Sequence, residues 1–242
     1  MKQLVVLFSA LILISCNKFK VEGKATGVAN GTNVFLVTTD STGTPKPKDT
    51  VKVTDGKFEF EGKSEKPEMS YVAFENTPNG NVGFILEKGT VAINFDAKNL
   101  EKNAISGTKN NDLYQSFNNA NLDIQKKVKD IYEANGAFMQ KAPETDEEKA
   151  KAQVIMAEFE KLRAEMDKRS KEFVAKNQNT FVSLLLVENL FYNNKMEVAK
   201  VKEFYDGLDS DLKETTSAKS VKKFLEQKSK SSTGASTPEK KK

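Results

Sequence analysis

Few residues in this chain of 242 combine a reactive type with a spacing that supports chemistry. The chain has no histidine, which excludes a Ser-His-Asp triad, a histidine metal ligand and a histidine proton switch. Its one cysteine, Cys16, excludes an intramolecular disulfide, a Cys-x-x-Cys redox pair and a cysteine zinc site. We therefore expect no catalytic residue, no metal and no cofactor, and the sequence predicts a protein that is not an enzyme.

Two further segments match a chemical site only superficially. Residues 56–64 (GKFEFEGKS) are close to a phosphate-binding loop, but five residues separate the glycines instead of four, and their alternation is typical of a strand. The acidic run Glu144–Glu148 has no identifiable partner for metal binding or acid–base chemistry. Acidic residues are favoured in the first turn of a helix. We interpret both segments as structural.

Cys16 ends a segment that has the features of an export signal. Lys2 gives a basic start, and residues 4–14 are an unbroken run of apolar or small residues. This run is too short for a membrane-spanning helix, which needs about 20 residues, and is typical of a signal peptide. Its end, Leu13-Ile14-Ser15-Cys16, resembles the lipobox of bacterial lipoproteins. In those proteins the cysteine thiol receives a diacylglyceryl group, the preceding bond is cut and the new amino terminus is acylated.

We therefore expect a lipoprotein signal peptide over residues 1–15 and a lipid anchor on Cys16, with acyl chains such as palmitate in the membrane. An ordinary signal peptide with an incidental cysteine is the alternative. Asn17 is not the aspartate of the inner-membrane retention signal known from some lipoproteins, and residues 18–20 (KFK) are not an acidic surface-export stretch. The expected location is the outer membrane, with the folded part facing the periplasm.

The clearest strand signal surrounds the dipeptide Asp55-Gly56. Apolar and polar residues alternate on both sides of it, which is typical of a type I′ hairpin. A two-residue loop there would pair Val53 with Phe58 on one face and Lys52 with Glu59 on the other.

A second hairpin is expected around Lys88-Gly89, with Phe84 opposite Ile93 on the same sheet. The polar residues 40–49 are expected to form a surface loop. Several short strands at regular spacing predict a small antiparallel β-sandwich or partial barrel over residues 17–108.

From Asn110 the apolar period changes to about 3.5 residues, which predicts one long helix. Its repeating face consists of Phe117, Ile124, Ile131 and Phe138. The helix should break near Pro143, and a capping box should start a second helix that returns as an antiparallel hairpin.

The apolar residues 181–190 predict a buried helix, and residues 196–208 and 217–227 predict two short ones. The fold class is therefore α+β, with a β-domain over residues 17–108 and a helical hairpin or bundle over residues 109–227.

The net charge of +4 is concentrated at the end of the chain. Residues 228–242 contain five lysines and one glutamate, and their composition predicts a disordered basic tail. Export argues against nucleic acid as a partner of this tail.

Several turn and strand motifs of the β-region occur together in one known family. They are Asn30-Gly31 within residues 23–37, Asp49-Thr50-Val51 before Asp55-Gly56-Lys57-Phe58, residues 84–89 (FILEKG), residues 105–108 (ISGT) and Asn110-Asn111. On these motifs, residues 18–227 resemble bacterial lipoproteins of the thiol:disulfide oxidoreductase type. In that family a β-domain of unknown function and a helical segment precede a thioredoxin-like module.

The resemblance carries no catalytic residue over to this chain. The family's redox site is a Trp-Cys-x-x-Cys motif in the thioredoxin-like module, whereas this chain has no tryptophan and a single cysteine. Where that module would begin, the chain continues into residues 228–242. The resemblance therefore does not imply oxidoreductase activity.

The preferred hypothesis is a lipid-anchored, non-catalytic periplasmic module that binds a protein partner through exposed sheet edges or a groove between the two regions. Three alternatives stay open: a histidine-free envelope enzyme, an accessory module for a separate thioredoxin-like oxidoreductase, and a structural spacer lipoprotein. A pocket of carboxylates or a lysine with shifted pKa values would favour the enzyme, and a broad apolar patch would favour the binding module.

Replacement of the lipidation site tests the anchor. Because no other thiol can accept lipid, we expect Cys16→Ser to leave an uncleaved or soluble precursor. Cell fractionation with mass spectrometry of the chain measures this. If a Cys16→Ser chain without any acyl group still partitions with the detergent-extracted membrane fraction, the anchor hypothesis is wrong.

Overall fold

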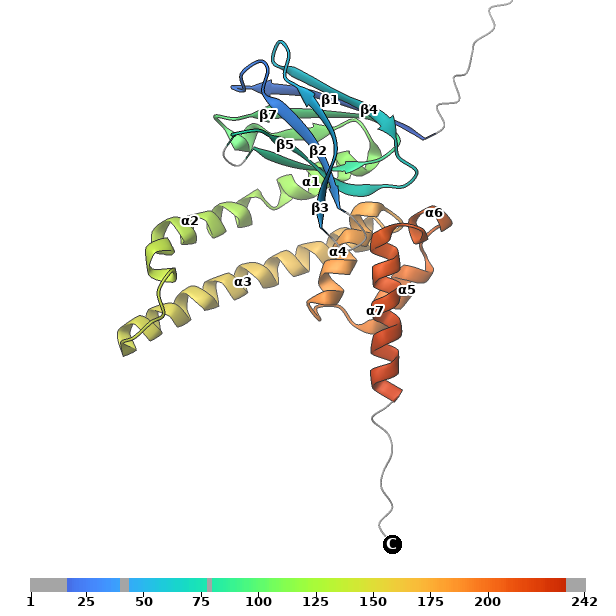
Figure 1. Ribbon diagram of the computed structural model, residues 1–242. Coiled ribbons are helices and arrows are strands. Elements are labelled where there is room, and N and C mark those ends of the chain that lie inside the picture. Colours follow the sequence, from blue (N-terminus) through green and yellow to red (C-terminus); the bar gives the residue numbers. More distant parts are fainter. Residues whose placement is uncertain (1–16, 40–43, 78–79, 234–242) are drawn as a thin grey trace, which may run out of the picture.

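The structure is a computed structural model that describes residues 17–39, 44–77 and 80–233. It confirms the α+β class, with a β-sandwich first along the chain and helices after it (Figure 1). One sheet has the order β4 (Lys57–Lys63), β1 (Lys18–Thr26), β7 (Gly89–Asp96) and β8 (Ala104–Ser106). The other has the order β3 (Pro45–Lys52), β2 (Asn33–Thr39), β5 (Glu68–Phe74) and β6 (Asn81–Leu86). Neighbouring strands are antiparallel except β1 and β7, which run parallel.

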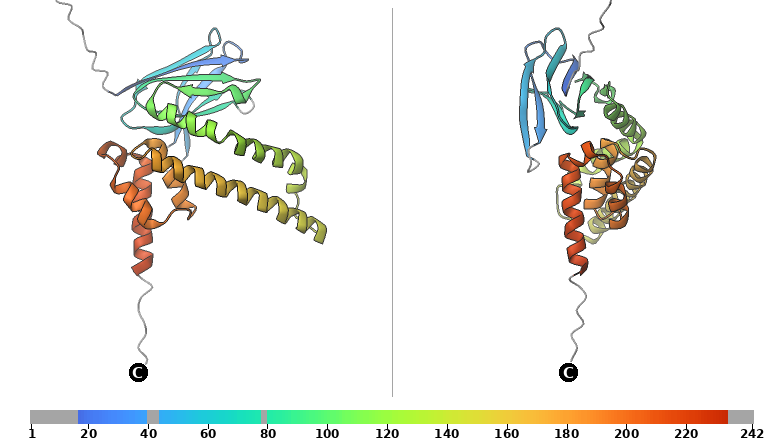
Figure 2. Two further views of the ribbon diagram at one scale, coloured as in Figure 1. Left: turned by 180° about the vertical axis from the view of Figure 1, so that it is seen from behind. Right: turned by 90° about the vertical axis from the view of Figure 1, so that its right-hand side faces the viewer.

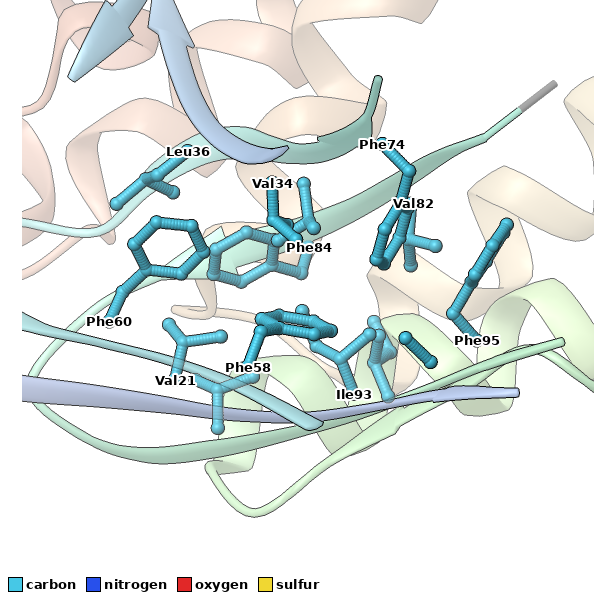
Figure 3. Close-up of a cluster of buried hydrophobic side chains, with 14 of the residues drawn as sticks. Val21, Val34, Leu36, Phe58, Phe60, Phe74, Val82, Phe84, Ile93 and Phe95 are labelled. Carbon is cyan, nitrogen blue, oxygen red and sulfur yellow. The ribbon is translucent and has the colours of Figure 1, made fainter. Parts of the chain in front are cut away.

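The two sheets pack face to face around one apolar core (Figure 3). Strand alternation sends every second side chain inward, and the rings meet across the sandwich. Phe74 of β5 stacks on Phe95 of β7 with ring centroids 4.3 Å apart, and Phe58 of β4 meets Phe74 edge-on at 5.4 Å. Burial of each such side chain contributes roughly 1.5–3 kcal/mol, so this core holds the sheets together.

A glycine in β1 makes room for one of these rings. Gly23 is the register partner of Phe58 in the β1–β4 ladder, and a Cβ atom at Gly23 would lie 1.9 Å from Cζ of the ring. Gly62 and Phe19 repeat the arrangement in the same ladder, where a Cβ atom would lie 2.8 Å from the ring. In each of these two cross-strand pairs, the glycine leaves the space that the opposite phenylalanine ring occupies, and this determines how β1 and β4 pack.

The turn predicted at Asp55-Gly56 is confirmed, but the hairpin predicted around it is wrong. Both residues have positive φ angles, 50° and 67°, as a type I′ turn requires. Thr54 and Lys57 exchange two backbone hydrogen bonds of 2.9 Å. Beyond that bridge the strands separate, because β3 pairs with β2 and β4 pairs with β1. The alternation predicted the buried face correctly and the strand pairing incorrectly.

Glu59, predicted to face Lys52, instead lies opposite Glu22 in the β1–β4 ladder. The ammonium group of Lys20 lies 2.8 Å from Glu22, 3.1 Å from Glu59 and 3.8 Å from Glu61. Hydrogen bonds to Glu22 and then Glu59 raise the pKa of Lys20. Exposed ion pairs contribute little to stability, so the main effect of Lys20 is to relieve repulsion between facing carboxylates.

The hairpin predicted at Lys88-Gly89 is also wrong. β6 pairs with β5, whereas β7 runs parallel to β1 in the other sheet. Gly89 has a φ of 113°, which glycine adopts readily, and the chain passes between the sheets at this point. Phe84 and Ile93, predicted as neighbours on one sheet, both point into the core from facing sheets (Figure 3).

The polar segment predicted as a loop over residues 40–49 is partly a strand. Residues 40–43 lie outside the described residues, and β3 begins at Pro45. Pro45 and Pro47 lack a backbone N–H donor, but β3 is an edge strand, where proline is tolerated and discourages pairing with another chain. A polar, proline-containing stretch can therefore form a strand here.

Helix α1 (Lys109–Ala120) covers the edge strands β6 and β8 at the side of the sandwich. Asn111 is fully buried, and its side-chain amide accepts from the backbone N–H of Ile85 at 2.9 Å and donates to the carbonyl of Ile85 at 2.7 Å. One turn later, Gln115 accepts from the backbone N–H of Ile105 in β8 at 2.8 Å. The side-chain amides of Asn111 and Gln115 therefore form backbone hydrogen bonds that a neighbouring strand would otherwise form at each edge.

The adjacent Asn110 joins α1 to the next buried helix. Its Nδ2 donates to Oε2 of Glu87 at 2.7 Å, and its Oδ1 accepts from the backbone N–H of Phe181 at 3.1 Å. Phe181 begins α4 (Phe181–Tyr192), which is buried as predicted for residues 181–190. Asn110 and Asn111 together therefore connect α1 to the sandwich, and Asn110 also connects it to α4.

The single long helix predicted from Asn110 is two helices. α1 ends at Ala120, and α2 (Leu122–Met139) begins after Asn121, whose backbone angles (φ −114°, ψ 8°) are not helical. The buried amide of Asn121 donates to the carbonyl of Phe117 at 2.7 Å. Such side-chain bonds to the backbone compete with regular helix, and the seven-residue apolar spacing carries no signal for the break.

α2 and α3 (Asp146–Lys176) form the predicted antiparallel hairpin, which projects as an arm (Figures 1 and 2). Arg169 fastens the base of the arm, because its guanidinium binds Asp123 at 2.7 and 3.0 Å and the carbonyl of Ala120 at 2.7 Å. This ion pair lowers the pKa of Asp123. Farther out, Tyr132 packs on Phe159 with ring centroids 5.3 Å apart.

The remaining helices pack with α4 around a second core: α5 (Val198–Asp206), α6 (Ser210–Lys213) and α7 (Thr216–Thr233). Because α7 continues to Thr233, residues 228–233 are helical and the predicted start of the disordered tail is corrected. Lys228 anchors this part of α7 through a 3.0 Å hydrogen bond to Asn194 and a contact with the ring of Phe224. Across residues 17–39, 44–77 and 80–233, none of the helices has the length and apolar character that a membrane crossing needs.

Filling the space of Gly23 tests the packing of β1 on β4. We expect Gly23→Ala to lower the free energy of unfolding by about 1–3 kcal/mol, because the added methyl group displaces the Phe58 ring. Gly136→Ala is the matched control, since a Cβ atom there meets nothing within 4 Å and alanine favours helix by about 0.5–1 kcal/mol. Urea denaturation measures both, and equal midpoints for Gly23→Ala and the unsubstituted protein would contradict the packing.

Removing the side-chain amide of Asn111 tests whether its hydrogen bonds to Ile85 stabilise the edge of β6. We expect Asn111→Leu to cost about 2–6 kcal/mol, because two buried backbone groups of Ile85 lose their partners at about 1–3 kcal/mol each. Ser116→Leu, on the exposed side of the same helix, should change stability by less than about 0.5 kcal/mol. Thermal unfolding compares the two variants, and a similar small change in both would show that the Asn111 bonds do not stabilise the edge.

Candidate functional site

Cys16, the one site residue predicted from the sequence, lies outside the described residues, and the structure begins with the next residue, Asn17. The carbonyl of Asn17 accepts a hydrogen bond of 2.8 Å from the backbone N–H of Ser64. The point at which the chain joins the sandwich is therefore fixed beside the end of β4.

The two segments interpreted as structural form a strand and the start of a helix. Residues 57–63 are strand β4 and follow a type I′ turn. Thr145 and Glu148 form a capping box at the start of α3. Backbone N–H donors of Thr145 and Glu144 lower the pKa of the Glu148 carboxyl. The charge of Glu148 therefore stabilises the helix start.

An open groove of about 670 Å³ lies beside α5 in the helical region. We call it the α5 groove. It is formed by the end of α3, the segment before α4 and the segment that leads into α5, and its lining residues are Lys171, Val174, Ala175, Gln178, Asn179, Asn194, Lys195, Met196, Glu197, Lys200, Glu203, Phe204 and Gly207.

Two asparagines shape the walls of the α5 groove. Asn179 and Asn194 have positive φ angles of 57° and 54°, a conformation that asparagine tolerates better than most residues. Asn179 is held by Asp209, because its Oδ1 accepts from the backbone N–H of Asp209 at 2.9 Å and its Nδ2 donates to the carboxylate at 3.2 Å. The chain therefore turns sharply after α3 and after α4, and the groove opens between these turns.

The floor of the α5 groove is apolar and its rim is charged. Val174, Met196 and Phe204 belong to the second core or pack against it. On the rim, Lys171 and Lys195 have no carboxylate oxygen within 4.0 Å among the described residues. Such an arrangement can hold an apolar side chain while the cations attract acidic neighbours.

The buried groups with raised pKa values lie elsewhere. Burial raises the pKa of the Tyr114 hydroxyl on α1 and of the Glu188 carboxyl on α4, and a hydrogen bond from Ser217 partly offsets the shift of Glu188. Neither residue lines the α5 groove. In the described part of the chain, no cluster of three or more Asp, Glu, His or Cys side chains is placed to hold a metal ion.

The sheet edges were named from the sequence as a possible contact surface. Three of the four edge strands, β6, β8 and β3, are protected, and β4 forms the fourth edge. The edges of β6 and β8 are covered by α1, and the edge strand β3 contains Pro45 and Pro47. The α5 groove has no clear pattern in the sequence, because its floor residues look like ordinary core positions of separate helices. The only local signals were the asparagines that follow α3 and α4.

The comparisons with known proteins concern the sandwich. Residues 19–114 match the family described as Domain of unknown function (DUF4369). None of the curated proteins compared matches the chain. The matched segment runs from β1 into α1 and includes Asn110 and Asn111. Residues 19–114 are therefore similar to DUF4369, and the α5 groove lies in the helical region after them.

Proposed function

We propose that this protein is a lipid-anchored envelope protein that acts as a non-catalytic binding module, with the α5 groove as its binding site. The observation that carries the proposal is an apolar floor beneath a rim on which Lys171 and Lys195 lack anionic partners among the described residues. The occupant is an apolar side chain of a protein partner, flanked by acidic residues. Burial of one such side chain contributes roughly 1.5–3 kcal/mol.

The anchor supports a role at the envelope. The apolar run before Cys16 and its Leu-Ile-Ser-Cys end have the features of a lipoprotein signal. Lipidation at Cys16 would hold the protein at the outer membrane with its folded part in the periplasm. Two or more acyl chains make such an anchor stable.

A second candidate is an accessory module for a separate thioredoxin-like oxidoreductase. Its support is the order of a region similar to DUF4369 followed by a helical region, the same order as in the lipoproteins that the sequence resembles. A histidine-free enzyme is less well supported, because the raised pKa of Glu188 arises outside the α5 groove.

Photo-cross-linking in cells tests the groove. A benzophenone side chain in place of Met196 on the groove floor should give a discrete protein adduct. The same group in place of Met156, which is 63% exposed on the arm, should not. Reversing the charge of the rim with Lys171→Glu and Lys195→Glu should reduce the yield of the adduct about fivefold, since two exposed charge contacts contribute about 1 kcal/mol together. An adduct that contains a thioredoxin-like protein would support the accessory role.

Two results would contradict the groove proposal. One is the absence of an adduct from position 196 in a chain that fractionates with the envelope. The other is an adduct of equal yield from positions 196 and 156, because the partner would then contact the protein without selecting the groove. A circular dichroism spectrum of each variant shows that the helices are intact.

A further inference from the structure

Three lysines from three neighbouring strands or turns gather at one end of the sheet that contains β1. Lys18 in β1 is the register partner of Lys63 in β4. On the other side of β1, Phe19 pairs with Gly89, which places Lys88 at the same end. All three lysines are exposed. We call these three residues the cationic end of the sandwich.

A shallow hollow of about 490 Å³ lies at this end. Lys18, Lys20 and Lys63 line it, together with Gly89 and Thr90. Glu61 also contributes to its wall. Three lysines and one glutamate therefore line the hollow. The ammonium group of Lys20 is already paired with Glu22, Glu59 and Glu61, which leaves those of Lys18 and Lys63 for a ligand.

The charges at the cationic end are not balanced within the described residues. Like charges directly opposite each other on a sheet repel, and neither Lys18 nor Lys63 has a carboxylate oxygen within 4.0 Å in the described part of the chain. Glu61 lies 3.8 Å from Lys20, and Glu87, next to Lys88, accepts hydrogen bonds from Asn110. Glu65, in the loop after β4, is exposed.

The cationic end is also where the chain joins the fold. Asn17 is bound to the backbone of Ser64, so the described chain enters the sandwich beside Lys18 and Lys63. Two residues span at most about 7 Å, which keeps Lys18 close to the anchor on Cys16. In Figure 1 the start of β1 lies far from the carboxyl-terminal end of α7.

We propose that the cationic end binds the phosphate groups of anionic phospholipids in the membrane that holds the anchor. This inference rests on the proposed anchoring through Cys16 and adds the surface that faces the membrane. Acyl chains alone tether the protein without fixing its orientation. Lys18, Lys63 and Lys88 supply electrostatic contacts that hold one end of the sandwich against the headgroups.

The same two strands provide an internal control. Lys24 in β1 is the register partner of Lys57 in β4, so a second pair of facing lysines lies at the opposite end of the ladder. Both residues are exposed. A general attraction of lysines to an anionic surface would shield both pairs from chemical modification. The proposed orientation shields only the lysines of the cationic end.

Lysine acetylation of the full-length lipidated protein in vesicles tests the proposal. The vesicles contain phosphatidylcholine alone or with phosphatidylglycerol, and mass spectrometry measures the rate at each lysine. We expect Lys18, Lys63 and Lys88 to react about fivefold more slowly in the anionic vesicles, as about 1 kcal/mol per lysine implies. High salt should abolish the difference, and Lys24 and Lys57 should not change.

Charge variants show whether the lysines act together. In Lys18→Gln/Lys63→Gln, Lys88 should lose most of its protection, and in the matched Lys24→Gln/Lys57→Gln it should keep it. Equal rates in both vesicle types, or equal protection of Lys24 and Lys57, would overturn the proposal. So would the same protection by inorganic phosphate with neutral vesicles, because the ligand would then be a soluble anion. Failure of the protein to float with either vesicle type would instead overturn the anchor itself.

Discussion

The structure depends on hydrogen bonds that side chains of α1 supply to the backbone of two edge strands, where the sandwich meets the helices. A buried backbone group without a partner costs about 1–3 kcal/mol, and β6 and β8 both present such groups toward α1. Asn111 and Gln115 supply the missing donors and acceptors from one face of one helix. Asn110 extends the same contact to the start of α4. The DUF4369 match includes Asn110 and Asn111, so the sandwich and the asparagines that bind its edge belong to one unit.

The sequence predicted which faces of the strands are buried but not which strands are neighbours. Alternation around Asp55-Gly56 specifies an inward face, and that face is the same whether the flanking strands pair or separate into two sheets. The parallel pairing of β1 with β7 joins residues far apart in the chain, and no local pattern encodes it. Helix starts were better predicted, because the capping box at Thr145 is a local interaction. The break at Asn121 was missed because a buried side chain decides it.

The candidate sites were less predictable than the fold. The lipidation of Cys16 stays a prediction from the sequence. The α5 groove combines Val174, Met196 and Phe204, each of which looks like a core residue within its own helix. Only the fold leaves one side of these residues uncovered. The cationic end arises in the same way, because strand register brings Lys18 and Lys63 face to face.

Helix α3 has a mechanical consequence. It has 31 residues, which gives a rod about 46 Å long, and its last turns line the α5 groove while its first turn forms the tip of the arm. A rotation of about 5° at the base moves the tip of such a rod by about 4 Å. Because one continuous helix forms both the arm and one wall of the groove, a tilt of α3 would displace both together.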